Sequence, residues 1–106
     1  MPRYTVRVEL VQNAKSKKEA GPDDYLKVRE VLAGAGFLHT VTDSDGKIYE
    51  LPPAEYRGSR EESRPEVANM VRTLINEIWT PNRVLVTEGL LHWSGLDQIK
   101  PATTKK

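Results

Sequence analysis

The sequence predicts an α+β fold of the ferredoxin-like kind, in which one antiparallel four-stranded sheet carries two helices on one face. Two segments have helical periodicity and begin at recognisable capping signals, at residues 22–35 and 64–79. Four segments have strand character, at residues 3–11, 37–42, 47–51 and 83–88. Their order along the chain is βαββαβ, which is the order of that fold.

The first strand and the first helix have the clearest patterns. Residues 3–11 alternate, with an apolar face and a polar face, which is typical of a strand buried on one side. Gly21 and Pro22 are suited to begin a helix, and Gly36 is suited to end it in the left-handed conformation. Between them runs an apolar stripe at helical spacing: Tyr25, Val28, Leu32 and Ala35.

The middle of the chain predicts a hairpin. Residues 37–42 are rich in β-branched and aromatic side chains, and residues 47–51 form the second strand of the pair. The "DSDG" run at 43–46 resembles the start of a calcium loop but lacks its later ligands, so we expect a hairpin turn and no metal. Two prolines at 52–53 end the strand, and residues 54–62 are expected to form a polar loop.

The C-terminal half begins with a capping box from Ser63 to Glu66, which starts a helix that runs to Trp79. Residues 83–88 form the next strand, and residues 90–96 form either a short fifth strand or an arm along a sheet edge. We expect one domain over residues 1–98 and a disordered tail over residues 99–106.

Composition restricts the class of protein. The 106 residues allow one small domain, and the absence of cysteine excludes disulfides and thiolate metal sites. The sequence has no apolar run of membrane-spanning length and no signal-peptide core, so we expect a cytoplasmic protein. The net charge is +1, so binding of nucleic acid would depend on locally clustered cations rather than on overall charge.

Two basic loops are the first candidate site. We expect the first and third strands to lie side by side and parallel, which would bring the loops after them, and both helix N-termini, to the same end of the sheet. Cations there could bind phosphates while a tyrosine stacks a base of single-stranded RNA. The alternative, common on any soluble surface, is that these charged loops are merely solvated. The residues concerned are Lys15, Lys17, Lys18, Tyr56, Arg57, Arg60 and Arg64.

The polar face of the sheet is the second candidate. It mixes charged and apolar residues, which is typical of a dimer interface, and we expect a homodimer. RNA binding on such a face would require exposed aromatic rings, and Tyr49 has the parity of a buried residue. The interface residues that we predict are Arg7, Glu9, Ile48, Leu85 and Trp93.

Catalysis would use a small set of residues. His39, in the second strand, or Glu55 could serve as a general base, and Arg57 or Arg60 could stabilise a phosphorane. An isolated histidine is more often structural, and His92 is not expected to take part. The sequence contains no phosphate-binding glycine loop and no zinc-ligand spacing, so we expect no cofactor and no small-molecule substrate.

Several blocks of the sequence resemble GhoS-type proteins, which are endoribonuclease antitoxins of type V toxin–antitoxin systems, and their uncharacterised relatives. The blocks are "RYTVRVEL", "DDYLKVREVLAGAGF", "DGKIYELPPAEY" and "VLVTEG", and they cover most of residues 3–89. The most distinctive run is formed by Tyr49, Leu51, Pro52, Ala54, Glu55 and Tyr56. The resemblance implies a ferredoxin-like fold akin to the small CRISPR-associated nucleases, often dimeric, and cleavage of a toxin messenger RNA.

Two other functions fit the same sequence. One is a non-enzymatic module, borne by a plasmid or phage, that dimerises through its sheet and binds nucleic acid or protein. The other is an accessory factor that binds only protein. Both keep the predicted fold, since a fold does not determine a function.

Overall fold

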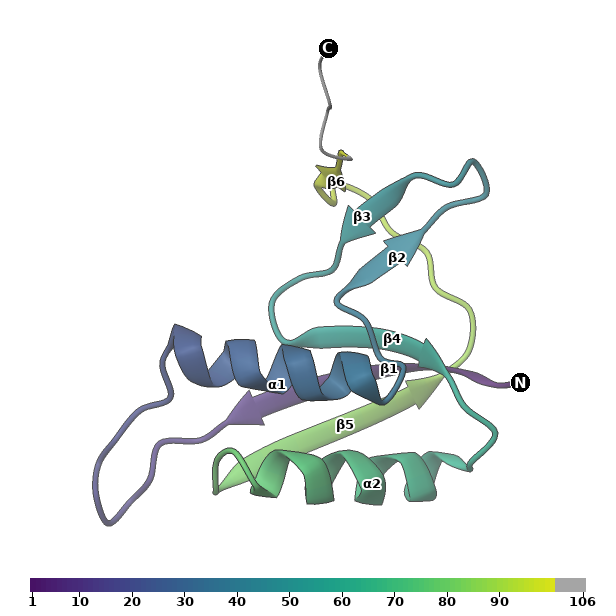
Figure 1. Ribbon diagram of the computed structural model, residues 1–106. Coiled ribbons are helices and arrows are strands. Elements are labelled where there is room, and N and C mark those ends of the chain that lie inside the picture. Colours follow the sequence, from purple (N-terminus) through teal and green to yellow (C-terminus); the bar gives the residue numbers. More distant parts are fainter. Residues whose placement is uncertain (101–106) are drawn as a thin grey trace.

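The computed structural model describes residues 1–100 and shows a mixed α+β fold, which confirms the predicted class (Figure 1). The strands belong to two three-stranded sheets, with the orders β4-β1-β5 and β2-β3-β6, so the prediction of one four-stranded sheet is wrong. The elements are β1 (Arg3–Leu10), α1 (Pro22–Gly34), β2 (Thr40–Thr42), β3 (Ile48–Glu50), β4 (Glu55–Ser59), α2 (Arg64–Asn76), β5 (Asn82–Glu88) and β6 (Gln98–Ile99).

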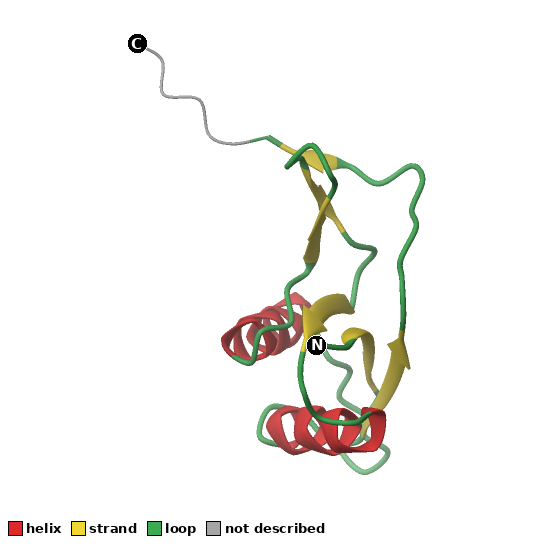
Figure 2. Cartoon of the chain, turned by 90° about the vertical axis from the view of Figure 1, so that its right-hand side faces the viewer, coloured by secondary structure: helices red, strands yellow, loops and turns green. Residues whose placement is uncertain are grey.

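The first sheet is built around β1, which pairs antiparallel with β4 on one side and β5 on the other. The alternation predicted for β1 is confirmed, because every second side chain is buried against the helices. Both helices pack on that face, and Figure 2 shows them in cross-section beside the strands. The centre of the core contains Val6, Val28, Leu32, Phe37, Val67, Val71 and Ile75, all fully buried. Neither helix of residues 1–100 is long and apolar enough to cross a bilayer.

Both helices begin where the sequence predicts. The backbone N–H of Gly21 donates to the Asp24 carboxylate at 2.9 Å, ahead of Pro22 in the first turn. In α2 the capping box is complete: the Ser63 N–H donates to the Glu66 carboxylate at 2.8 Å, and the Glu66 N–H donates to the Ser63 hydroxyl at 3.4 Å. The second helix ends at Asn76, earlier than predicted.

The strand β4 was not predicted, because residues 54–62 were expected to be loop. It occupies the place beside β1 that we expected residues 47–51 to take, and it is antiparallel to β1, with Arg3 opposite Ser59 and Arg7 opposite Glu55. The prediction of parallel central strands is therefore wrong. After the crossover through α1, residues 37–42 run in the same direction as β1. The hairpin that follows reverses the chain once, so β4 runs opposite to β1.

The second sheet lies beyond the edge of the first (Figures 1 and 2). Its β2–β3 hairpin confirms the turn at 43–46, where the Asp43 carboxylate accepts the N–H groups of Asp45 and Lys47 at 2.9 Å each. The predicted short strand at 90–96 is absent from the described chain. The last strand is β6, at 98–99, so part of the predicted tail is paired with β3, and the rest of that tail, residues 101–106, lies outside the described residues.

One bridge joins the two halves of the molecule. Leu38 and Arg57 exchange two backbone hydrogen bonds, of 2.9 and 2.7 Å, just before the chain leaves for β2. At the next residue of β4, Gly58 lies against the end of α1, where a Cβ atom would be only 2.2 Å from the Gly36 carbonyl oxygen. The bridge leaves the first residues of β4 without a strand on their outer side, and a cavity forms there.

Candidate functional site

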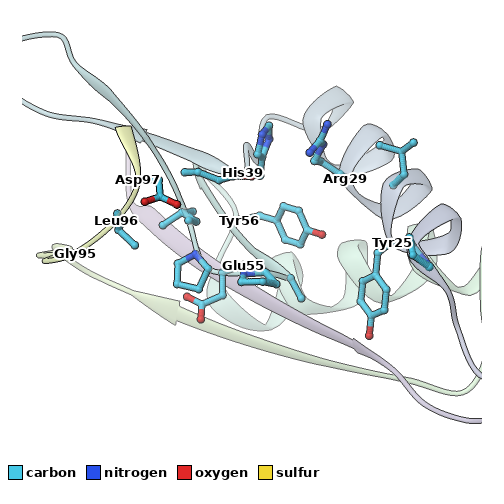
Figure 3. A pocket seen from close by; sticks show the side chains of 15 residues that line it. Tyr25, Arg29, His39, Glu55, Tyr56, Gly95, Leu96 and Asp97 are labelled. Carbon is cyan, nitrogen blue, oxygen red and sulfur yellow. The ribbon is translucent and has the colours of Figure 1, made fainter. Parts of the chain in front are cut away.

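The main candidate site is a cavity of about 740 Å³ between α1, the beginning of β4 and the arm at 95–97, which we call the His39 cavity (Figure 3). The β2–β3 ribbon closes one side of the cavity. The Leu51 N–H donates to the His39 carbonyl at 2.8 Å, and this hydrogen bond holds the two ends of the ribbon together beside the cavity. The residues that bring chemistry to its lining are Tyr25, Arg29, His39, Glu50, Glu55 and Asp97.

His39 is a partly buried imidazole on this wall. Burial lowers its pKa below the ordinary value of 6.5, the Arg29 guanidinium lowers it further, and the Glu50 carboxylate partly opposes this. The imidazole is therefore neutral near pH 7 and able to accept a proton. Figure 3 shows His39 and Arg29 along the same rim, with Glu55 on the far side of the Tyr56 ring. The two predicted bases thus line one cavity.

Arg29 is the charged residue of the cavity lining that sequence reasoning missed. It lies on α1, one turn beyond Tyr25, and its guanidinium lines the cavity. The signal that could have found it is Leu26, an apolar residue outside the core stripe of α1 and yet part of the cavity lining. An exposed leucine outside the core stripe of a helix indicates a second surface of that helix to examine.

Tyr56 does not act as predicted. Its side chain is only 3% exposed and belongs to the core, so its ring is not free to stack a base. Burial raises the pKa of its hydroxyl, and the neighbouring Tyr25 raises it further. Tyr25 itself is held by the backbone, because the Leu10 N–H donates to its hydroxyl at 3.0 Å. Both phenols thus support the wall of the cavity.

The two basic loops do not meet. The loop with Lys15, Lys17 and Lys18 follows the end of β1, whereas the loop with Arg60 follows the end of β4. Because β1 and β4 are antiparallel, the two loops lie at opposite ends of the sheet, as do the N-termini of the helices (Figure 1). The predicted common pole for RNA is therefore wrong. The lysine side chains are exposed in a loop shaped by Asn13, whose side-chain Oδ1 accepts the N–H groups of Lys15 and Ser16 at 3.0 Å each.

Two of the three predicted arginines already have acidic partners. Arg60 forms a two-pronged ion pair with Glu62, at 2.9 and 2.6 Å, and donates to the Ala35 carbonyl at 3.1 Å. The hydrogen bonds to the Glu62 carboxylate raise the pKa of the Arg60 guanidinium. Arg64 lies 3.7 Å from Glu88 on an exposed surface, where an ion pair is weak. Arg60 is thus a structural residue, and Arg64 a surface one.

Arg57 points to the face of the first sheet that the helices leave open. Its guanidinium donates to the Thr5 hydroxyl at 2.9 Å and to the Gly89 carbonyl at 2.6 Å. It therefore ties three strands together, β4 and β1 directly and the end of β5 through Gly89. It does not line the His39 cavity, so it cannot serve His39 as the catalytic cation.

The predicted dimer residues are divided between the two sheets. Arg7, Glu9 and Leu85 share the open face of the first sheet, with Arg7 opposite Leu85. Glu9 also binds Arg83 across the strands at 3.0 Å. Ile48 lies in the second sheet, so its predicted place on this face is wrong. The Trp93 ring packs on the Tyr49 ring of that sheet, with 5.7 Å between ring centroids.

Within residues 1–100 there is no group of three or more His, Asp or Glu side chains placed to hold a metal ion. A scan against protein-family models and a search of curated proteins found no match to the sequence. The resemblance to GhoS-type antitoxins stays a prediction that depends on the short sequence blocks alone.

Proposed function

We propose that this is a small RNA-binding protein that cleaves single-stranded RNA in the His39 cavity without a metal ion. The observation that carries the proposal is the joint placement of His39, Glu55 and Arg29 around one cavity. They supply a base for the ribose 2′-hydroxyl and a cation for the developing phosphoryl charge, two of the roles that metal-independent cleavage needs. That the substrate is a messenger RNA, as for GhoS-type antitoxins, is supported by the sequence resemblance.

The chemistry assigns a role to each group. His39, neutral near pH 7, accepts the proton of a ribose 2′-hydroxyl as that oxygen attacks the neighbouring phosphorus. Arg29 stabilises the charge that develops on the phosphoryl oxygens. The bond from phosphorus to the 5′-oxygen breaks, and this oxygen takes a proton from solvent, which reaches the partly exposed His39 side of the cavity. Glu55, which lines the same cavity, is the alternative candidate for the base.

We propose that the first sheet and its two helices form a variant of the ferredoxin-like fold. If the Leu38–Arg57 bridge is taken as a short fourth strand, the antiparallel order is residues 37–39, β4, β1 and β5, with both helices on one face. That is the strand order which a βαββαβ chain adopts in this fold. The second sheet is then an elaboration of the hairpin between the second and third strands.

We also propose a cytoplasmic homodimer. The open face of the first sheet would form the interface, around Leu85, which is 60% exposed in the single chain. Arg7 and Glu9 on the same face would contribute polar contacts across it. Equilibrium sedimentation of the protein and of a Leu85→Lys variant tests this, because a charge at the centre of the interface should shift the dimer to monomer. A monomeric parent protein would refute it.

The decisive experiment measures cleavage of end-labelled single-stranded RNA in the presence and absence of EDTA. We expect His39→Gln and Arg29→Gln each to lower the rate by about 100-fold or more. His92→Gln is the matched control, because His92 is exposed and does not line the cavity. Loss of cleavage in EDTA, or equal loss in the His92 variant, would refute the assignment.

A non-enzymatic binding module is the second candidate, and one observation favours its protein-binding form. Three carboxylates, of Glu50, Glu55 and Asp97, line the cavity beside the cation of Arg29. A lining with three negative charges and one positive charge repels a phosphate backbone, whereas sites for RNA usually carry an excess of positive charge. Binding of RNA without cleavage, with affinity that falls steeply with salt, would support the nucleic-acid form of this module. Absence of RNA binding would leave a protein partner.

A further inference from the structure

A second, smaller cavity of about 360 Å³ lies where the end of β4 meets β2 and the arm at 90–93. It shares no lining residue with the His39 cavity. Two cationic side chains, Arg3 and Arg57, line it together with the hydroxyl-bearing Ser59, Thr40 and Thr42. Leu91 and Trp93 form an apolar wall. We call it the Arg3 cavity.

The charge of this cavity is unbalanced. Its described lining contains two guanidinium groups and no carboxylate. The ion pairs within residues 1–100 involve Arg60, Arg64 and Arg83, so neither lining arginine has an acidic partner. The two cations also affect each other: burial lowers the pKa of Arg57, and the nearby charge of Arg3 lowers it further. Two like charges that line one cavity favour binding of an anion between them.

The geometry of Arg57 is fixed before any ligand arrives. Two of its N–H groups are used by the Thr5 hydroxyl and the Gly89 carbonyl. A guanidinium has five donors, so three remain for an anion. Arg3 is exposed and makes no side-chain hydrogen bond within residues 1–100, so it is free to close over a ligand. One fixed guanidinium and one exposed, unengaged guanidinium form a suitable pair for phosphate oxygens.

We propose that the Arg3 cavity binds a phosphomonoester, with the phosphate on Arg3 and Arg57 and the organic part on the wall of Leu91 and Trp93. A phosphate group offers enough acceptor oxygens for two guanidiniums and neighbouring hydroxyls, whereas a carboxylate offers two. The volume exceeds that of a phosphate alone, and the apolar wall suits a sugar or base. A nucleotide 5′-phosphate has this chemistry. The site does not depend on the proposed cleavage, since it shares no residue with the His39 cavity.

The test titrates the full chain with adenosine 5′-monophosphate, with inorganic phosphate and with adenosine, by calorimetry and by backbone amide NMR shifts. We expect the monophosphate to bind most tightly and to move the amides of Gly58 and Ser59. Arg3→Gln should weaken it by about tenfold or more, which is the effect of losing a charged hydrogen-bond donor. Arg7→Gln is the matched control, because Arg7 carries the same charge on the same face of β1 without lining the cavity.

The outcomes are distinct. Three results would each overturn the proposal. The first is an equal loss of monophosphate affinity in Arg7→Gln, the second is adenosine binding as tightly as its monophosphate, and the third is inorganic phosphate binding where the monophosphate does not. A 5′-phosphorylated RNA oligomer and its 5′-hydroxyl counterpart identify the source of the phosphate: preference for the phosphorylated oligomer indicates an RNA end, and exclusion of both oligomers indicates a free nucleotide. His39→Gln should leave the affinity unchanged, so failure of the cleavage proposal does not affect this result.

Discussion

Replacing Gly58 by alanine should strongly destabilise this protein, although the change adds one methyl group. The new Cβ would lie 2.2 Å from the Gly36 carbonyl oxygen and 2.9 Å from the Phe37 ring. Carbon and carbonyl oxygen atoms in contact are normally about 3.3–3.6 Å apart, so one backbone must move by about 1 Å. Both neighbours belong to rigid parts of the structure, a helix end and the core, so moving either of them costs free energy.

The magnitude follows from two contributions. Forcing a methyl group into a packed interior costs about 1–3 kcal/mol. The shift also strains the two hydrogen bonds between Leu38 and Arg57, at 2.9 and 2.7 Å, each with a net value of about 1 kcal/mol. We therefore expect Gly58→Ala to lower the free energy of unfolding by about 3–5 kcal/mol. A domain of this size has about 5–15 kcal/mol in total, so the loss is a large fraction of its stability.

Urea unfolding followed by tryptophan fluorescence measures this loss, because Trp79 is partly buried and its indole N–H donates to the Val11 carbonyl at 2.7 Å. Gly34→Ala is the matched control. Gly34 is in the last turn of α1, where a Cβ would meet no atom within 4 Å, so alanine should be neutral or stabilising by up to about 1 kcal/mol. A loss below about 1 kcal/mol in Gly58→Ala would refute the close approach of β4 to the helix end.

Three further predictions concern the rest of the fold. Asn82→Ala should cost about 2–3 kcal/mol in urea unfolding, because the buried amide makes three hydrogen bonds of 2.8–2.9 Å; an unchanged midpoint would contradict this. Ser63→Ala should cost about 1 kcal/mol by opening the capping box of α2, and Ser63→Asp should restore it. Because folding lowers the pKa of His39, the unfolded chain takes up its proton first, so stability should fall as the pH drops below 6.5 through that lowered value. His39→Gln should remove this part of the pH dependence, and an identical pH profile in the variant would be inconsistent with a lowered pKa.

The elements with strong local signals could be predicted from the sequence. The strand β1 alternates without exception, and both helices begin at caps whose hydrogen bonds are local. Such signals need no knowledge of the rest of the molecule, because the groups that satisfy each other lie within a few residues. The turn at 43–46 belongs to the same class, since Asp43 binds the backbone just after it.

The strand β4 could not be predicted, because its core face carries almost no apolar side chain. Of its residues, Tyr56 faces the core beside Val6, and the next position on that face is Gly58. A glycine there serves the close contact with the helix end, but in the sequence it reads as a loop signal. The predicted sheet places residues 47–51 beside β1 instead. The predicted parallel direction of the central pair is a separate error, because the one reversal after residues 37–42 makes any third strand antiparallel to β1.

One feature of β4 explains both why the sequence does not predict this strand and why the two cavities lie beside it. Glu55 lines the His39 cavity and Arg57 and Ser59 line the Arg3 cavity, so three of the five residues of β4 serve a cavity rather than the core. Polar residues at those positions remove the alternation by which a strand is recognised. Local rules are expected to fail where a segment carries function, since side chains there are chosen for a ligand. The least predictable strand is thus the one on which variants should be concentrated, and Glu55→Gln and Arg57→Lys separate the two cavities. The first variant should change only the chemistry at His39 and the second only the binding of a phosphomonoester, whereas a change in both by either variant would show that β4 holds one site rather than two.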